Sequence, residues 1–341
     1  MKRALTTIIQ LAITVALLWW IFHDEHKRAQ MIDALHTANL WWFLPGLAAF
    51  GLVLVIQTQR WQILLRAIGI HFSWLRAWQL VMVGMFFNLF LLGATGGDVV
   101  KIFYAMRETK TDKAAAFLSI VLDRVLGLLA LVLISLLIVV WQFQKLITTP
   151  IAQGLLATIA LILGGSVGVI IASVVVAVLR LEDKLPERMP MRRGIIDLAV
   201  AIRHYMSRPG ALLSAFALAF FVHMLVFSTF YFSARAFTDK LSIVNIYSVM
   251  PIVNTITSLP ISLQGVGMRE HLFQDLLAAL YSTPAAIAVL ISMGGYLVTV
   301  AWSLVGGLVF LSYRPSDGRS ASLREMSAAT DQIAEHPETA P

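Results

Sequence analysis

The chain has 341 residues, of which 59% are hydrophobic and 13% charged, and its mean hydropathy is +0.81. Soluble domains carry roughly 25% charged residues, so this composition excludes an ordinary soluble protein and indicates one membrane domain. The net charge of +7 is typical of cytoplasmic membrane loops and anionic lipid contact and needs no nucleic-acid partner, while the lack of cysteine excludes disulfides and thiolate metal sites.

Apolar runs recur along the whole chain. A spanning helix needs roughly 20 apolar residues. The first run follows two basic residues but ends in aromatic residues without a cleavage site, so we expect an uncleaved helix. The sequence predicts six spanning helices, at 5–22, 41–58, 116–141, 155–179, 211–237 and 284–312.

Two further apolar regions, 77–106 and 245–281, are interrupted. The first breaks at Gly93 and again at Gly96-Gly97, and the second contains Pro251 and Pro260 before two more glycines. Lipid cannot satisfy the N–H and C=O groups of a broken backbone, so such breaks are tolerated only beside protein or water. We therefore predict two re-entrant helical hairpins that line a polar cavity.

The charge distribution favours the hairpins over two further full crossings. With both termini in the cytoplasm, most lysines and arginines outside the apolar runs fall on the cytoplasmic side, as the positive-inside rule requires. Each hairpin then lies between spanning helices, and the second half repeats the first upside down. The predicted fold is an all-α polytopic membrane protein with an inverted repeat, which is typical of transporters.

One polar segment lies between two apolar runs, and another follows the last run. Within 180–210, apolar residues recur at helical spacing among arginines, which predicts either a helix on the cytoplasmic leaflet or a solvated connecting helix. Residues 315–341 are polar and are expected to form a disordered cytoplasmic tail. The membrane domain is accordingly placed at 1–314.

Asp123 and Arg124 lie together in the apolar run 116–141. Charges inside a membrane helix are costly, and adjacent helical residues point about 100° apart, so each needs its own partner or a wet cavity. Arg124 could bind an anionic group while Asp123 holds it or carries a proton. Alternatively, both residues tie this helix to a hairpin.

Gly96, Gly97 and Asp98 stand where the first broken helix resumes, with Lys101 one turn further on. Backbone N–H groups at a helix start attract anions, which predicts an anion site at this point. Asp98 could instead act only as the N-cap of a helix beginning at Val99. Lys101 could likewise be a lysine that extends its ammonium to the cytoplasmic surface.

The second hairpin repeats this pattern. Gly265 and Gly267 precede Arg269 and Glu270, which form either an anion site with a proton carrier or an ion pair holding the turn. Asn88 is expected to hydrogen-bond across the first hairpin.

Taken in order, these motifs resemble the flippase-like membrane family that includes the membrane domain of lysylphosphatidylglycerol synthases and the UPF0104 inner-membrane proteins. The resemblance covers roughly 1–314. Members usually carry an arginine where this chain has Lys101, and lysine keeps the charge but loses bidentate phosphate geometry. Members also carry a proline before the first glycine pair. The matching motifs are Asn88, Gly96-Gly97-Asp98 with Lys101, Asp123-Arg124, and Leu259-Pro260-Ile261-Ser262 leading to Gly265, Gly267 and Arg269-Glu270.

This resemblance implies movement of lipids with charged headgroups between leaflets of the cell inner membrane. The expected partner is an anionic membrane lipid, either a phospholipid or a polyprenyl-phosphate carrier. No aminoacyltransferase domain, catalytic motif, nucleotide site or metal cluster is recognised, so we expect a transporter without a cofactor and not an enzyme. A small-solute or ion-coupled transporter on the same scaffold is the alternative, and a membrane scaffold with structural charges is a third hypothesis.

Overall fold

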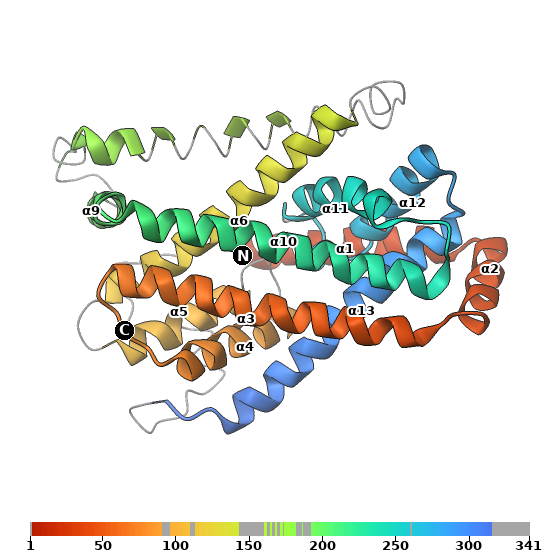
Figure 1. Ribbon diagram of the computed structural model, residues 1–341, viewed down its shortest axis with the longest axis horizontal. Coiled ribbons are helices and arrows are strands. Elements are labelled where there is room, and N and C mark those ends of the chain that lie inside the picture. The colour runs from red at the N-terminus through yellow and green to blue at the C-terminus, as the bar shows by residue number, and fades with distance from the viewer. Residues whose placement is uncertain are drawn as a thin grey trace.

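The protein is helical throughout the part of the chain that the structure describes. This computed structural model covers residues 2–90, 96–109, 113–142, 192–259 and 261–315, with part of 160–186, and every regular element in these ranges is a helix (Figure 1). The predicted all-α class is confirmed. Residues 91–95, Pro260, about half of the predicted span 155–179 and the predicted tail from 316 onward lie outside the described residues.

Four of the described helices are long and apolar enough to cross a membrane, and each overlaps a predicted span. They belong to the helices α3, α6, α10 and α13. The structure bounds these at Phe43–Ala67, Lys113–Trp141, Pro209–Phe237 and Ala285–Ser312.

The remaining elements are shorter or less apolar. The first predicted span is a helix, α1, and Asp24 caps the short helix α2 that follows it. The bounds are Lys2–Phe22 (α1), Glu25–His36 (α2), Trp74–Phe90 (α4), Gly96–Glu108 (α5), Arg192–Met206 (α9), Ile243–Thr257 (α11) and Met268–Tyr281 (α12), with 3-10 turns at Leu40–Trp42 (η1) and Leu263–Gly265 (η3).

Each interrupted region forms a pair of short helices that pack against each other, α4 with α5 and α11 with α12. The α4–α5 pair lies toward one end of the long axis of the molecule and the α11–α12 pair toward the other (Figure 1). Each pair belongs to its own apolar core, one around Trp61, Leu80 and Tyr104, the other around Phe227, Met250 and Phe273. Both pairs pack against α13, which therefore connects the two halves.

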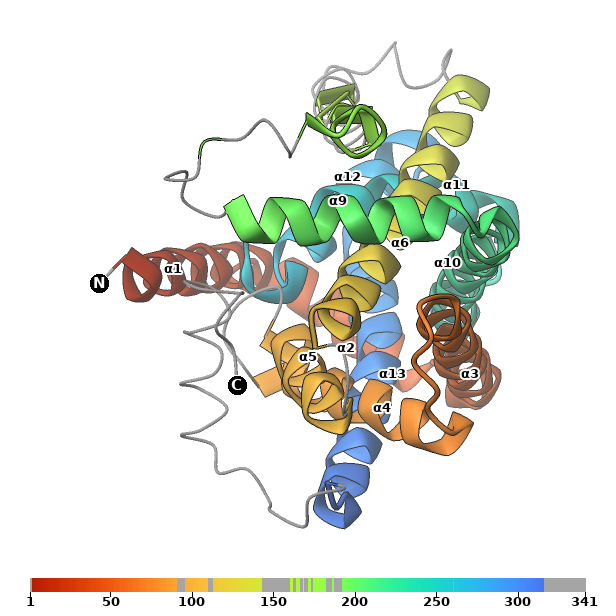
Figure 2. The same ribbon diagram turned by 90° about the vertical axis from the view of Figure 1, so that its left-hand side faces the viewer.

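Helix α3 is longer than predicted. The apolar run was expected to end at residue 58, but the helix continues to Ala67 and carries Arg60 inside the protein, where it is 4% exposed. The prediction was wrong because hydropathy ends a span at a charge, whereas this charge finds a partner on another helix. Figure 2 shows α3 and α10 side by side, as their contacts also indicate.

The helix predicted within 180–210 is present as α9 and packs on the protein. Its Tyr205 hydroxyl donates to the Leu64 carbonyl at 3.2 Å, and His204 Nε2 lies 3.0 Å from the Ala67 carbonyl. Ala199 and Tyr205 are buried. These contacts hold α9 against the end of α3. The sequence predicted a helix on the cytoplasmic leaflet or a solvated connecting helix, and neither prediction included this contact.

Candidate functional site

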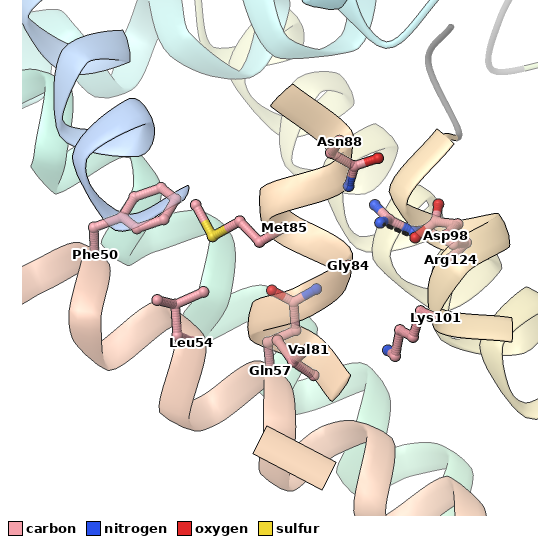
Figure 3. Close-up of a pocket in the computed structure, with 10 residues that line it drawn as sticks. All are labelled: Phe50, Leu54, Gln57, Val81, Gly84, Met85, Asn88, Asp98, Lys101 and Arg124. Atoms are coloured by element: carbon pink, nitrogen blue, oxygen red, sulfur yellow. Dashed lines mark hydrogen bonds and ion pairs between the residues drawn. The ribbon is translucent and has the colours of Figure 1, made fainter. Parts of the chain in front are cut away.

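A polar cavity of about 160 Å³ lies between α3, α4, α5 and α6, within the first half of the protein (Figure 3). Asp98 and Lys101 reach it from α5, where their spacing of three residues places them on one face. Arg124 reaches it from α6. The lining residues are Phe50, Leu54, Gln57, Val81, Gly84, Met85, Asn88, Asp98, Lys101 and Arg124.

Asp98 and Arg124 form an ion pair across this cavity, and Arg124 Nη2 donates to Asp98 Oδ1. The Arg124 side chain is 52% exposed, so the cationic end of the cavity opens at the protein surface. Asp98 was also considered as the N-cap of a helix beginning at Val99. That alternative is wrong, because α5 begins at Gly96 and places Asp98 inside the first turn.

Lys101 is buried, with 5% of its surface exposed, and its ammonium lies 3.9 Å from the centre of the Trp61 ring. A cation over an aromatic face is attracted by the ring quadrupole. The Trp61 indole N–H donates to Ser119 Oγ at 3.1 Å, which holds the ring in place. The alternative of a lysine extending to the membrane surface is therefore wrong, and Lys101 points toward α3 within the cavity (Figure 3).

Asp123, the neighbour of Arg124, does not line the cavity. Its carboxylate accepts hydrogen bonds from Arg60 Nε at 2.7 Å and Nη2 at 2.9 Å, and the two side chains are 2% and 5% exposed. Sequence reasoning missed Arg60 and assigned it to a loop. The apolar residues that follow it, Trp61 and Leu64-Leu65, are the signal that the helix continues. Each member of Asp123-Arg124 thus has its own partner on a different helix, as expected.

The two glycines of the first hairpin serve close packing. The Gly97 N–H donates to Asn88 Oδ1 at 2.8 Å, so Asn88 bridges α4 and α5 as predicted. A Cβ atom on Gly97 would lie 2.6 Å from Asn88 atoms and would overlap the Gly84 carbonyl. The expectation of a free Gly97 N–H for an anion is wrong, because Asn88 already occupies that donor. Gly96 begins α5 beside it.

In the second hairpin a carboxylate accepts a hydrogen bond from a glycine N–H, as the Asn88 amide oxygen does in the first. Glu270 accepts a hydrogen bond from the Gly267 N–H at 2.6 Å and another from the Ser292 hydroxyl at 2.8 Å. Glu270 is 3% exposed. The Gly267 N–H is therefore also occupied, which corrects the expectation of a free donor there. Glu270 ties the turn to α13 and is not paired with Arg269, so the alternative of an Arg269–Glu270 ion pair is wrong.

Arg269 lies against the same turn. Its Nη2 donates to the Gln264 carbonyl at 2.7 Å, and its guanidinium carbon lies 4.6 Å from the centre of the Tyr296 ring. Gly265 allows this approach, since a Cβ atom there would lie 3.2 Å from Arg269 Nη2. The predicted residues thus form two groups, one around the cavity and one at this turn.

Gln264 joins the two groups. Its Nε2 donates to the Asn88 carbonyl near the end of α4, where helix carbonyls lack partners within the helix. Its Oε1 accepts from the Tyr296 hydroxyl at 2.9 Å. The two hairpins therefore meet at Asn88 and Gln264. Gln264 was noted in the glycine turn but not as a site residue, because a contact across 176 positions leaves no local sequence signal.

The charges around the cavity do not cancel. Arg60 and Asp123 neutralise each other, and Asp98 balances Arg124. Lys101 belongs to no ion pair among the residues that the structure describes. One positive charge is left over in a buried polar space, and burying a charge is costly unless it is paired. The cavity is accordingly suited to a negatively charged group.

Four apolar helices of membrane-crossing length, two of which line a charged cavity, define a polytopic membrane protein. Residues 7–307 match the family of the lysylphosphatidylglycerol synthase transmembrane region, and the chain belongs to this family. It is also similar to the UPF0104 membrane protein PH1989 of Pyrococcus horikoshii, with 25% identity over 139 residues. That match covers 40% of this chain and 40% of the relative. The resemblance seen in the motifs is thereby confirmed.

Proposed function

We propose that the protein is a transporter that moves an anionic lipid, a phospholipid or a polyprenyl-phosphate-linked lipid, between the leaflets of the cell inner membrane. It binds and moves its substrate without catalysing a covalent change. Membership of a family named for the membrane region of a lipid-modifying synthase supports a lipid role. Asp98, Lys101 and Arg124 are the residues proposed to meet the headgroup.

The observation that carries the proposal is the uncompensated Lys101 charge in a cavity that opens at half-exposed Arg124. A volume of about 160 Å³ has room for a phosphate group and a few water molecules but not for acyl chains. A lipid would therefore place its headgroup in the cavity and leave its chains in the surrounding membrane. A cavity that opens at the protein surface suits that arrangement better than an enclosed cavity.

The short helices support the re-entrant part of the proposal. Helices α4, α5, α11 and α12 have 17, 13, 15 and 14 residues. At 1.5 Å per residue they are about 20–26 Å long, which is shorter than the roughly 30 Å hydrocarbon core. We propose that each pair enters and leaves on one side of the membrane, that the pairs enter from opposite sides, and that both termini are cytoplasmic.

Leaflet-resolved flipping of fluorescent phosphatidylglycerol in proteoliposomes tests this function. We expect Lys101→Met and Arg124→Gln to slow flipping at least tenfold, because both remove positive charge from the cavity. Arg66→Gln is the matched control, since Arg66 is an exposed arginine in the last turn of α3, away from the cavity. Flipping at the parent rate by folded Lys101→Met and Arg124→Gln proteins would overturn the assignment.

A transporter of small anions or other solutes on the same scaffold is the second candidate. The small volume of the cavity favours it, because a free anion fits inside without any chain to accommodate. Uptake of labelled phosphate into the same proteoliposomes distinguishes the two. Uptake without lipid flipping would favour the solute transporter, and flipping without uptake would favour the lipid transporter.

A further inference from the structure

In the part of the second hairpin's turn that the structure describes, two buried polar atoms lack a hydrogen-bond partner, Ser262 Oγ and Arg269 Nη1. Ser262 is 4% exposed and Arg269 8%. None of the ion pairs among the described residues includes Arg269, and the neighbouring Glu270 is engaged by the Gly267 N–H and Ser292. A buried guanidinium that lacks a carboxylate is costly and marks functional sites in membrane proteins.

The orientation of Arg269 defines the class of ligand that it lacks. Nη2 is occupied by the Gln264 carbonyl at 2.7 Å, and the guanidinium carbon lies 4.6 Å from the centre of the Tyr296 ring. Nη1 remains available at the opposite end of the fork. A guanidinium presents its donors in one plane that matches the oxygens of phosphate or carboxylate. An oxyanion is therefore the chemically matched partner.

Gln264, whose carbonyl accepts from Arg269 Nη2, has an unusual backbone conformation. Its φ of 52° and ψ of 25° are left-handed, which disfavours residues other than glycine and is held only where surrounding contacts impose it. Those contacts are the Asn88 carbonyl, the Tyr296 hydroxyl and the Arg269 guanidinium. If the side chain of Gln264 leaves Asn88 and Tyr296, the turn loses the bonds that hold this conformation.

We propose that the second hairpin carries a second oxyanion subsite, in which Arg269 binds the anion and Gln264 closes the site. The subsite is separate from the cavity at Lys101 and Arg124, and the two communicate through the contact between Gln264 and Asn88. Because Arg269 Nη1 is buried, an anion reaches it only after the turn opens. Gln264 is the residue of this turn that has the left-handed conformation and holds Arg269 Nη2, so we assign the opening to it. The inference rests on the proposed function in one respect, namely that the anion is the phosphate of the transported headgroup.

The test measures thermal unfolding of the purified protein in maltoside micelles with added inorganic phosphate, against chloride at equal ionic strength. A ligand that binds the folded state at a free concentration c stabilises it by RT ln(1 + c/Kd), so the unfolding temperature rises further as the ligand concentration exceeds Kd. In a Lys101→Met background, which removes the uncompensated cation of the cavity, we expect a phosphate-dependent rise that Arg269→Gln abolishes. Arg269→Lys keeps the charge without the planar fork. This variant should need about tenfold more phosphate for the same rise in unfolding temperature.

Gln264→Asn provides the second, independent measurement. Asparagine tolerates the left-handed conformation and keeps the amide, but its shorter side chain cannot reach Asn88. We expect this variant to respond to phosphate at concentrations severalfold lower than the parent, because the site no longer has to open. A phosphate response that persists without Arg269, that disappears with Lys101→Met, or that Gln264→Asn leaves unchanged would overturn the subsite.

Phosphatidylglycerol added to the micelles in place of phosphate distinguishes the sources of the anion. A rise that requires Arg269 with phosphatidylglycerol assigns the subsite to a lipid headgroup, and one seen with inorganic phosphate alone assigns it to a free anion. No rise with either probe refutes the subsite. Lipid flipping in the same preparations is scored separately, so a protein that flips lipid without an Arg269-dependent response refutes the subsite alone. An Arg269-dependent response without flipping refutes only the transport of lipid.

Discussion

The buried pair of Arg60 and Asp123 should stabilise the protein only as a pair. Both side chains are almost fully buried and share two hydrogen bonds of 2.7 and 2.9 Å. Removal of one partner from such a pair leaves an uncompensated buried charge and costs about 3–5 kcal/mol. That cost lowers the ratio of folded to unfolded protein by about 10²–10⁴. Replacement of both by apolar residues of similar volume is often neutral, so Arg60→Met with Asp123→Leu should recover most of the loss.

The measurement is a double-mutant cycle on the free energy of unfolding, obtained by titration with sodium dodecyl sulfate in mixed micelles and followed by tryptophan fluorescence. The exposed pair Arg28 and Glu25 is the control, because its side chains are 49% and 90% exposed. A pair of that kind contributes about 0.2–1 kcal/mol. Additive losses for Arg60→Met and Asp123→Leu would refute a buried pair that acts as one unit.

The same double variant also tests the role of Asp123. If Asp123 serves only to hold α6 against α3, the protein with Arg60→Met and Asp123→Leu should flip lipid at close to the parent rate. If it regains stability but loses flipping, Asp123 has a part in transport that the pair does not explain. Stability and activity therefore have to be measured on the same preparation.

Three further predictions concern other parts of the molecule. Gly97→Ala should destabilise the protein by about 1–3 kcal/mol through overlap with the Gly84 carbonyl, whereas Gly210→Ala meets no neighbouring atom and should be nearly neutral in the same unfolding assay. Lys101→Arg should retain flipping where Lys101→Met loses it, and loss in both would show that a positive charge at this position is not sufficient for transport. Burial, and then the Glu108 carboxylate, raise the pKa of Tyr313, whose hydroxyl donates to Glu108 at 2.9 Å. The neutral hydroxyl is thus favoured in the folded state, so stability should fall as pH rises above about 10, and Tyr313→Phe should remove that dependence in unfolding measurements across pH.

Much of the fold could be predicted because its causes are local. Hydropathy and length identify the spanning helices, and glycine interruptions identify the two broken regions. The cluster of Asp98, Lys101 and Arg124 was also predictable, because charges in apolar runs must meet inside the protein. The ends of the helices could not be predicted in this way. Arg60 shows why, since a charge ends an apolar pattern even where the helix continues past it.

The functional partners of these residues could not be read from the sequence. Asp123 was equally able to face the cavity or another helix, and only packing assigns it to Arg60, 63 positions earlier. The glycine N–H groups were predicted to be free, but Asn88 and Glu270 occupy two of them.

Hydropathy and glycine placement alone establish that the protein lies in a membrane, where its helices are interrupted, and that charged groups in the apolar runs need partners, because lipid penalises every unsatisfied polar group regardless of the fold. The packing of the helices determines which charge is neutralised by which partner, that Lys101 has no ion-pair partner among the described residues, and that Gln264 connects the two hairpins. Those outcomes depend on distances between residues far apart in the chain, and such distances are set by how the helices pack.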